Sequence, residues 1–272
     1  MTVLDELLAA TGSPAGEAAI RLPSASNHVV RVGNVVVRLP PRARSGVDHG
    51  REAVNARVAA EAGVGPPVLL ARDDGALVTE LVAGVALTPE RVRADHVLVQ
   101  RMGALLAAAH RLPPFAGSFD PWTATDALLD ELRPQDEWWR LRDELEAIRF
   151  PLGATVPCHV DPWPGNVLVA DDRLVLVDWE YSAMSDPLWD LADFAVEAGL
   201  DVRGRRALLR AHGSDGPDEE RRVRVYEALA DVHWATWLLL EEAAGNTAED
   251  FREQATRRLA RAGSTIHELA PS

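Results

Sequence analysis

The 272-residue sequence predicts an α+β fold, with a small N-terminal β-sheet lobe that includes one helix and a larger, mainly helical C-terminal lobe. Before residue 83, short β-branched runs alternate with turn dipeptides, as strands and hairpins do. After residue 88, longer apolar patterns follow helical spacing. One further pair of short apolar runs, within 167–177, predicts a hairpin inside the larger lobe. We therefore expect two parts, 1–83 and 84–272.

The first lobe is expected to begin with a short amphipathic helix over residues 1–14. The tight-turn dipeptide Gly33-Asn34 stands between two valine-rich runs, which should pair as a hairpin. The strands expected before the next helix are 18–22, 28–32 and 34–39.

The other elements follow from the same signals. Residues 51–62 predict a helix that Gly63 ends, and 68–82 predict a second hairpin, giving five strands in all. Residues 115–126 are expected to form a loop. Helices of the larger lobe are expected over 94–110, 126–149 with an interruption at Pro134, 188–198, 202–212, 218–244 and 248–262.

The composition limits the possible functions. The formal net charge is −14, which argues against a nucleic-acid binder, because such proteins need a basic surface. No apolar run is long enough to predict membrane insertion, and the acidic N-terminus does not predict a secretory signal. The single cysteine, Cys158, excludes an internal disulfide framework and indicates a cytoplasmic protein. Nothing in the sequence indicates an oligomeric state.

The most informative stretch, Cys158 to Ala192, contains His-Val-Asp-Pro-Trp-Pro-Gly-Asn and then Val-Asp-Trp-Glu. The predicted hairpin would bring Asn166, at its entry, beside Asp178, at its exit, with Asp161 one loop away. Each residue alone would be ordinary turn chemistry. As an ordered set they fit phosphoryl transfer, which needs oxygen ligands for Mg²⁺ and a carboxylate that orients and deprotonates the acceptor hydroxyl.

These motifs resemble the H-x-D-x-x-x-x-N and D-x-D/E elements of the aminoglycoside phosphotransferase/choline kinase family. Asp-Trp-Glu-Tyr and the later Asp-Pro-Leu-Trp-Asp-Leu-Ala most resemble its bacterial choline and ethanolamine kinase-like members. The resemblance implies a bilobal, protein-kinase-like fold, with Mg²⁺ as cofactor and ATP or GTP as co-substrate. It implies that Asp161 is the base and that Asn166 and Asp178 hold the metal.

The nucleotide side departs from the family pattern. The loop that contains Ser24, Ser26 and Asn27 resembles the family's phosphate loop without its glycines. The chain contains no lysine, and Arg38 stands at the position that resembles the kinase lysine. Glu52 would be its partner. Alternatively, Arg38 is an outward strand residue and Glu52 an acid favoured by the helix dipole.

The resemblance also assigns two supporting regions. The backbone of Glu80, Leu81 and Val82 would form the hinge that meets the adenine. In the larger lobe, Asp190 resembles the aspartate that braces the catalytic loop, and His159 would orient that loop without titrating.

The acceptor side is suggested by Trp234 and Trp237. Three residues apart, they project from one face of a helix. Choline kinases carry a similar Trp-x-x-Trp that binds the quaternary ammonium, and tryptophan is the best cation–π partner. Glu180 would add the counter-charge. The alternative is that both tryptophans only pack in the core.

The sequence therefore predicts a kinase for a small cationic, hydroxylated substrate, choline or ethanolamine. An aminoglycoside or another natural product is the alternative acceptor, since the catalytic residues would be the same. A nucleotide-binding pseudokinase is a second alternative, because the lysine is missing and the phosphate loop is poor in glycine.

Overall fold

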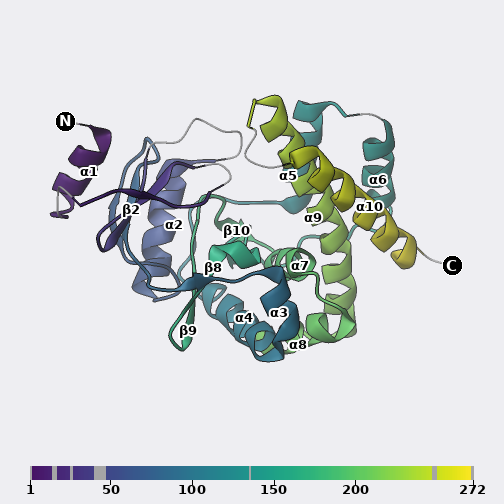
Figure 1. Ribbon diagram of the computed structural model, residues 1–272. Helices are drawn as coiled ribbons and strands as arrows, with labels where there is room; N and C mark the ends of the chain where they lie inside the picture. The colour runs from purple at the N-terminus through teal and green to yellow at the C-terminus, as the bar shows by residue number, and fades with distance from the viewer. Residues whose placement is uncertain are drawn as a thin grey trace.

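The computed structural model describes residues 2–13, 17–24, 27–39, 47–134, 136–246 and 250–270. A small antiparallel sheet lies at one end of the molecule and a larger group of helices at the other, with the two termini at opposite ends (Figure 1). The predicted α+β fold is confirmed.

The small sheet has five antiparallel strands in the order β1-β2-β3-β5-β4. Val32 pairs with Val35 across the turn at Gly33, whose φ is 55°, so the predicted hairpin is correct. Inward-facing valines pack against Leu7 and Leu8 of the first helix. The elements are α1 (Val3–Ala10), β1 (Ile20–Arg21), β2 (Val29–Val32), β3 (Val35–Arg38), α2 (His49–Glu61), β4 (Val68–Ala71) and β5 (Leu77–Glu80).

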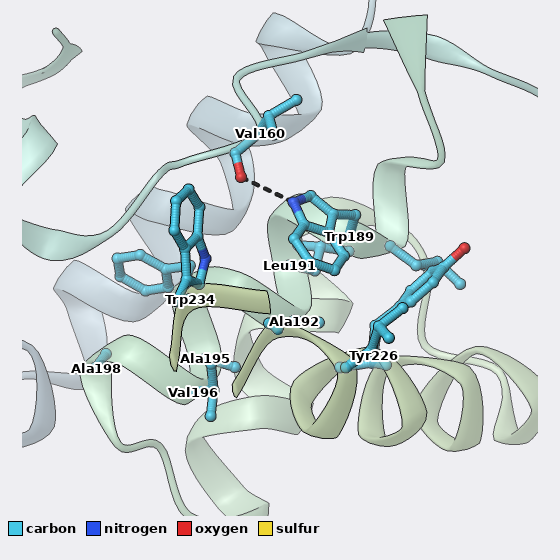
Figure 2. Packing of buried hydrophobic residues seen from close by; sticks show 14 of the residues in the cluster. Val160, Trp189, Leu191, Ala192, Ala195, Val196, Ala198, Tyr226 and Trp234 are labelled. Carbon is cyan, nitrogen blue, oxygen red and sulfur yellow. Dashed lines mark hydrogen bonds between the residues drawn. The ribbon is translucent and has the colours of Figure 1, made fainter. Parts of the chain in front are cut away.

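The helical part is organised around one long helix that is buried through most of its middle. Aromatic side chains such as Trp189 and Tyr226 fill the contact between this helix and its neighbours (Figure 2). The helices are α3 (Pro89–Ala94), α4 (His96–Ala109), α5 (Pro121–Leu132), α6 (Asp136–Glu146), α7 (Pro187–Ala198), α8 (Val202–His212), the long α9 (Pro217–Ala243) and α10 (Phe251–Leu269).

Two small sheets hold the predicted catalytic stretch. One joins β6 (Val85–Ala86), β8 (Val167–Ala170) and β9 (Arg173–Leu176), and the other joins β7 (Val156–Cys158) and β10 (Ala183–Ser185). The pair β8–β9 is the predicted hairpin, which is confirmed. The boundary of the two parts at residue 83 stays a prediction.

Some expected boundaries were wrong. The expected loop 115–126 contains the start of α5, because Asp120 caps the helix by accepting the N–H groups of Trp122 and Thr123 and Pro121 occupies the first turn. The expected helix 94–110 begins only at His96, since α3 ends at Ala94 and Asp95, between the two helices, caps α4 separately. The last helix continues to Leu269, beyond the expected end at 262.

In the part of the chain that the structure describes, no helix is long and apolar enough to cross a membrane.

Candidate active site

The β8–β9 hairpin places Asn166 and Asp178 at one end. Val167 pairs with Leu176, and the N–H of Val177 donates to the carbonyl oxygen of Asn166 at 2.9 Å. Asp178 follows directly, in a left-handed conformation with φ of 64°. That conformation turns the chain out of the strand, and the side chain of Asp178 remains 35% exposed.

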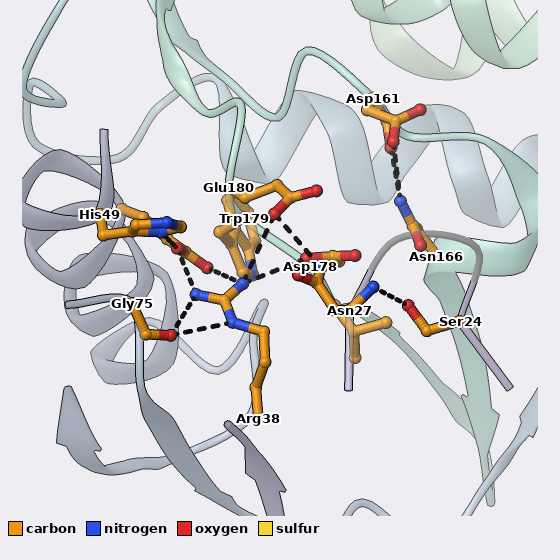
Figure 3. A network of polar contacts seen from close by, with 12 residues as sticks. Ser24, Asn27, Arg38, His49, Gly75, Asp161, Asn166, Asp178, Trp179 and Glu180 are labelled. Atoms are coloured by element: carbon orange, nitrogen blue, oxygen red, sulfur yellow. Dashed lines mark hydrogen bonds and ion pairs between the residues drawn. The ribbon is translucent and has the colours of Figure 1, made fainter. Parts of the chain in front are cut away.

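The catalytic loop brings Asp161 to the same end of the hairpin. The amide nitrogen of Asn166 donates to the backbone carbonyl of Asp161 at 3.0 Å and to its carboxylate at 3.2 Å (Figure 3). Burial, followed by the charges of Asp193 and Asp178, raises the pKa of Asp161 well above its ordinary value. The structure thus brings the three predicted catalytic residues together.

The donor set suits Mg²⁺. With its amide nitrogen bound to Asp161, Asn166 has its amide oxygen left for a cation, and the partly exposed Asp178 carboxylate offers another oxygen. Hard oxygen donors in this number are what Mg²⁺ takes from proteins, with phosphates and water completing its shell. The residues present therefore fit the metal that the motif implies.

Two residues of α7, Trp189 and Asp190, hold the loop before Asp161 through hydrogen bonds. Asp190 accepts the N–H groups of His159 and Val160, each at 2.8 Å, and the indole N–H of Trp189 donates to the carbonyl of Val160 at 2.8 Å (Figure 2). His159 hydrogen-bonds through Nε2 to the carbonyl of Val177 at 2.9 Å, and burial lowers its pKa. This bond ties the loop to the residue directly after β9, and the lowered pKa favours the neutral imidazole that donates it.

The nucleotide side contains a buried ion pair. Both terminal nitrogens of Arg38 bond to the carboxylate of Glu52, at 2.7 and 2.5 Å, and the guanidinium also donates to the carbonyl of Gly75 at 3.1 Å. Burial alone would lower the pKa of Arg38, but the hydrogen bonds and charge of Glu52 raise it above the ordinary value. Arg38 is 5% exposed, so it is not the outward strand residue of the alternative interpretation.

The same guanidinium reaches the larger part of the molecule. Its Nη1 lies 3.6 Å from Asp178 and 3.7 Å from Glu180 (Figure 3). Asn27 donates to Glu180 at 3.2 Å. The side-chain oxygen of Asn27 is buried without a hydrogen-bond partner among the described residues. Glu180, predicted as an acceptor residue, is therefore in contact with the nucleotide side.

Other residues that are predicted to bind the nucleotide make hydrogen bonds with neighbours in the small-sheet part of the molecule. The hydroxyl of Ser24 accepts the N–H of Asn27 at 3.0 Å, whereas Ser26 lies outside the described residues. At the predicted hinge, Glu80 donates to Pro67 and Leu81 to Asn34, each at 2.9 Å.

These two bonds occupy N–H groups of the predicted hinge. A backbone N–H contact with adenine would therefore fall to Val82, which is half-buried directly after them. The hinge assignment stays a prediction.

Three aromatic rings form a wall on the acceptor side. Trp234 lies edge to face with Trp237, at 6.1 Å between ring centroids, and with Tyr181, at 5.7 Å. Trp234 is 6% exposed and Trp237 is half-buried, so the pair extends from the core toward the surface. Trp163, in the catalytic loop, covers Gly165 so closely that a Cβ there would lie 2.2 Å from the ring.

Sequence reasoning missed the buried charges next to this wall. Asp193 accepts the indole N–H of Trp234 at 2.6 Å, and Glu197, one turn later on α7, pairs with Arg258 of α10. The available signal was an acidic residue inside an apolar segment, since Asp193 lies between an alanine and a phenylalanine in a helix that is buried along most of its length. Buried carboxylates of this kind need a stated partner or a function.

Three features of this site are typical of protein-kinase-like phosphotransferases. They are a carboxylate on a braced loop, an Asn/Asp pair across the adjoining hairpin and a buried Arg–Glu pair under the small sheet. That is the class that the fold and the site define. The chain belongs to the phosphotransferase enzyme family, whose model matches residues 19–226.

Individual relatives agree with this assignment. The chain is 34% identical over 121 residues to protein LicA of Haemophilus influenzae, an alignment that covers 42% of this chain and 44% of that protein. The crystal structure of a choline/ethanolamine kinase family protein from Mesorhizobium loti is similar over 97% of this chain and 95% of that one, with TM-score 0.82 and 32% identity. Choline kinase LicA of Streptococcus pneumoniae gives TM-score 0.80 at 20% identity, over 98% of each chain.

More distant members share the fold. The GDP complex of an aminoglycoside 2'-phosphotransferase-IIIa mutant is similar over 98% of each chain, with TM-score 0.71 and 15% identity. At this identity the likeness concerns the fold alone.

Proposed function

We propose that this protein is a kinase that transfers the γ-phosphoryl group of ATP or GTP to the hydroxyl of a small amino alcohol, with choline as the first candidate and ethanolamine as the second. The observation that carries the proposal is the aromatic wall of Trp234 and Trp237 beside the buried carboxylates on the acceptor side. Indole faces with negative charge behind them favour a cationic head group. The name of the similar protein from M. loti, a choline/ethanolamine kinase family protein, supports the same substrate class.

The roles follow from the geometry. Asp161 would orient the acceptor hydroxyl and take its proton, while Arg38, fixed by Glu52, would bind the phosphates. Asn166 and Asp178 would hold Mg²⁺, which supplies charge neutralisation to the phosphoryl group when it is bound. The phosphate loop and the hinge would cover the nucleotide.

The pseudokinase alternative rests on the missing lysine and on the glycine-poor phosphate loop. Against the first reason, Arg38 forms a buried pair with Glu52, like the lysine–glutamate pair of kinases. The antibiotic-kinase alternative keeps the same catalytic residues and differs only in the acceptor, so the acceptor must be tested directly.

The test is nucleotide turnover with Mg²⁺ against choline, ethanolamine, an aminoglycoside, a sugar and no acceptor. Wild type is compared with Asp161→Asn and with Asp171→Asn, a matched control in the exposed hairpin turn. Loss of a general base costs about 10²- to 10⁴-fold in rate. We expect choline-dependent turnover that Asp161→Asn reduces by this factor and Asp171→Asn leaves intact.

Turnover only with another acceptor would keep the kinase and reject the amino alcohol. Nucleotide binding without turnover of any acceptor in the panel would reject the amino-alcohol kinase and leave either the pseudokinase or an acceptor outside the panel.

A further inference from the structure

Glu180, which the sequence suggested as the acceptor's counter-charge, makes contacts on the nucleotide side. Glu180 is 4% exposed, accepts a hydrogen bond from Asn27 and lies 3.7 Å from the guanidinium of Arg38. Glu180 therefore shares the Arg38 cation with Glu52 and Asp178 on the nucleotide side.

A second carboxylate lies directly behind the aromatic wall. Asp193 is fully buried on α7, and its Oδ1 accepts the indole N–H of Trp234 at 2.6 Å. Its Oδ2 has no hydrogen-bond partner among the described residues. A buried carboxylate held by one neutral donor is costly, because nothing in that contact balances its charge.

The two neighbouring acids, unlike Asp193, are paired with arginines. Glu197 accepts from Arg258, with one contact at 2.9 Å, and Asp231 accepts from Arg261 at 2.7 and 2.5 Å. Both arginines come from α10, which packs along α9 (Figure 1). The last helix thus forms ion pairs with Glu197 and Asp231, whereas Asp193 is hydrogen-bonded to an indole and feels the charge of Arg258 only at longer range.

Asp193 is also electrostatically close to the proposed base. Its negative charge is the foremost of the charges that raise the pKa of Asp161, second only to burial. Burial and then the charge of Glu197 raise the pKa of Asp193 itself, while the hydrogen bond from Trp234 and the charge of Arg258 act in the opposite direction. A further cation nearby would also favour the ionised form of Asp193. A cation between the ring wall and Asp161 would therefore lie within the field of this carboxylate.

We propose that Asp193 is a specificity-determining residue of the acceptor site, which fixes the Trp234 ring through the indole N–H and supplies the negative charge that a small alcohol with one ammonium group requires. This inference rests on the acceptor site of the proposed function. A carboxylate bound to the indole N–H also polarises the ring toward a more negative face, which strengthens a cation–π contact.

The test separates charge from shape by calorimetric titration of the full chain with two ligands. One is choline and the other is 3,3-dimethylbutan-1-ol, its neutral isostere. Asp193→Asn keeps an oxygen that can accept the indole N–H and removes the charge. The matched control is Asp143→Asn, which removes one exposed charge from α6.

We expect Asp193→Asn to raise the Kd for choline about tenfold or more, as for loss of a charged interaction, and to leave the Kd for the neutral isostere unchanged within about twofold. Asp143→Asn should change neither. If Asp193→Asn does not fold, Asp193→Ser tests the same charge in a smaller side chain.

Three results would overturn the inference: an equal rise in the Kd for both ligands in Asp193→Asn, no change in either Kd, or no binding of choline by the wild type. A wild type that binds choline in an Asp193-dependent way but transfers no phosphoryl group would support the inference and reject the proposed kinase.

Discussion

The carboxylate of Asp190 accepts the backbone N–H of Val160 at 2.8 Å and so stabilises a β-branched residue whose φ is 76°. Valine seldom adopts this left-handed conformation, which costs about 1 to 3 kcal/mol. The surrounding bonds from His159 and Trp189 hold the backbone there. Since Val160 directly precedes Asp161, its unusual backbone sets the direction of the proposed base.

The two hydrogen bonds from this loop to Asp190 predict that Asp190→Asn displaces Asp161. An asparagine offers one oxygen and turns an N–H₂ group toward the second backbone donor, so one of the two bonds is lost. We expect a free energy of unfolding lower by about 1 to 3 kcal/mol and a fall in kcat that exceeds the change in acceptor KM. Urea unfolding and steady-state kinetics measure both. Asp172→Asn, in the exposed hairpin turn, is the control, and an unchanged kcat in Asp190→Asn would contradict this displacement.

The buried pair of Arg38 and Glu52 predicts a large stability difference between two similar substitutions. Glu52→Gln leaves the buried guanidinium without its main counter-charge and should lower the free energy of unfolding by about 3 kcal/mol. It should also raise the KM for the nucleotide, because Arg38 loses its fixed position. Glu253→Gln breaks an exposed pair with Arg257 and should have little effect, because exposed pairs contribute little. Similar denaturation midpoints for the two variants would argue against the pair's structural role.

The aromatic wall predicts a selective defect in Trp237→Ala. Loss of one cation–π contact of about 0.5 to 2 kcal/mol should raise the KM for choline from about 2-fold to 30-fold and leave the KM for the nucleotide unchanged. Trp139→Ala removes another half-buried tryptophan, from α6, and serves as the control. If both variants change the choline KM equally, Trp237 is only a packing residue.

His233 predicts a specific acid sensitivity. This buried imidazole hydrogen-bonds to Thr125 at 3.1 Å, and burial lowers its pKa to about 3, from an ordinary value of 6.5. Because the folded form resists the proton that the unfolded form takes up, stability falls as pH decreases from about 6.5 toward 3. The slope from this group is at most about 1.4 kcal/mol per pH unit.

The measurement is the free energy of unfolding against pH for the wild type and His233→Asn, whose amide can still donate to Thr125. The variant should lose this part of the slope. His267→Asn, at an exposed position near the end of α10, should keep it. Parallel curves for wild type and His233→Asn would show that another group causes the acid sensitivity.

Much of the catalytic geometry was predictable because its signals are local. Asp171-Asp172 between two apolar runs specifies a hairpin, and the hairpin alone brings Asn166 near Asp178. The start of α5 was missed although Asp120 and Pro121 carry a helix-start signal. The cap residue, rather than the composition of the whole segment, determines where this helix begins.

The sequence by itself determined the α+β fold, the hairpin and the composition of the catalytic set, since turn chemistry and hydrophobic period act within a few residues. Only the tertiary structure decided which carboxylate lies on the nucleotide side and which lies behind the aromatic wall. Glu180 and Asp193 lie in one stretch of chain, yet the first contacts Arg38 of the small sheet and the second contacts Trp234 of α9. Those contacts depend on how distant elements pack, and on which cations α10 brings to the neighbouring acids, so no local pattern encodes them.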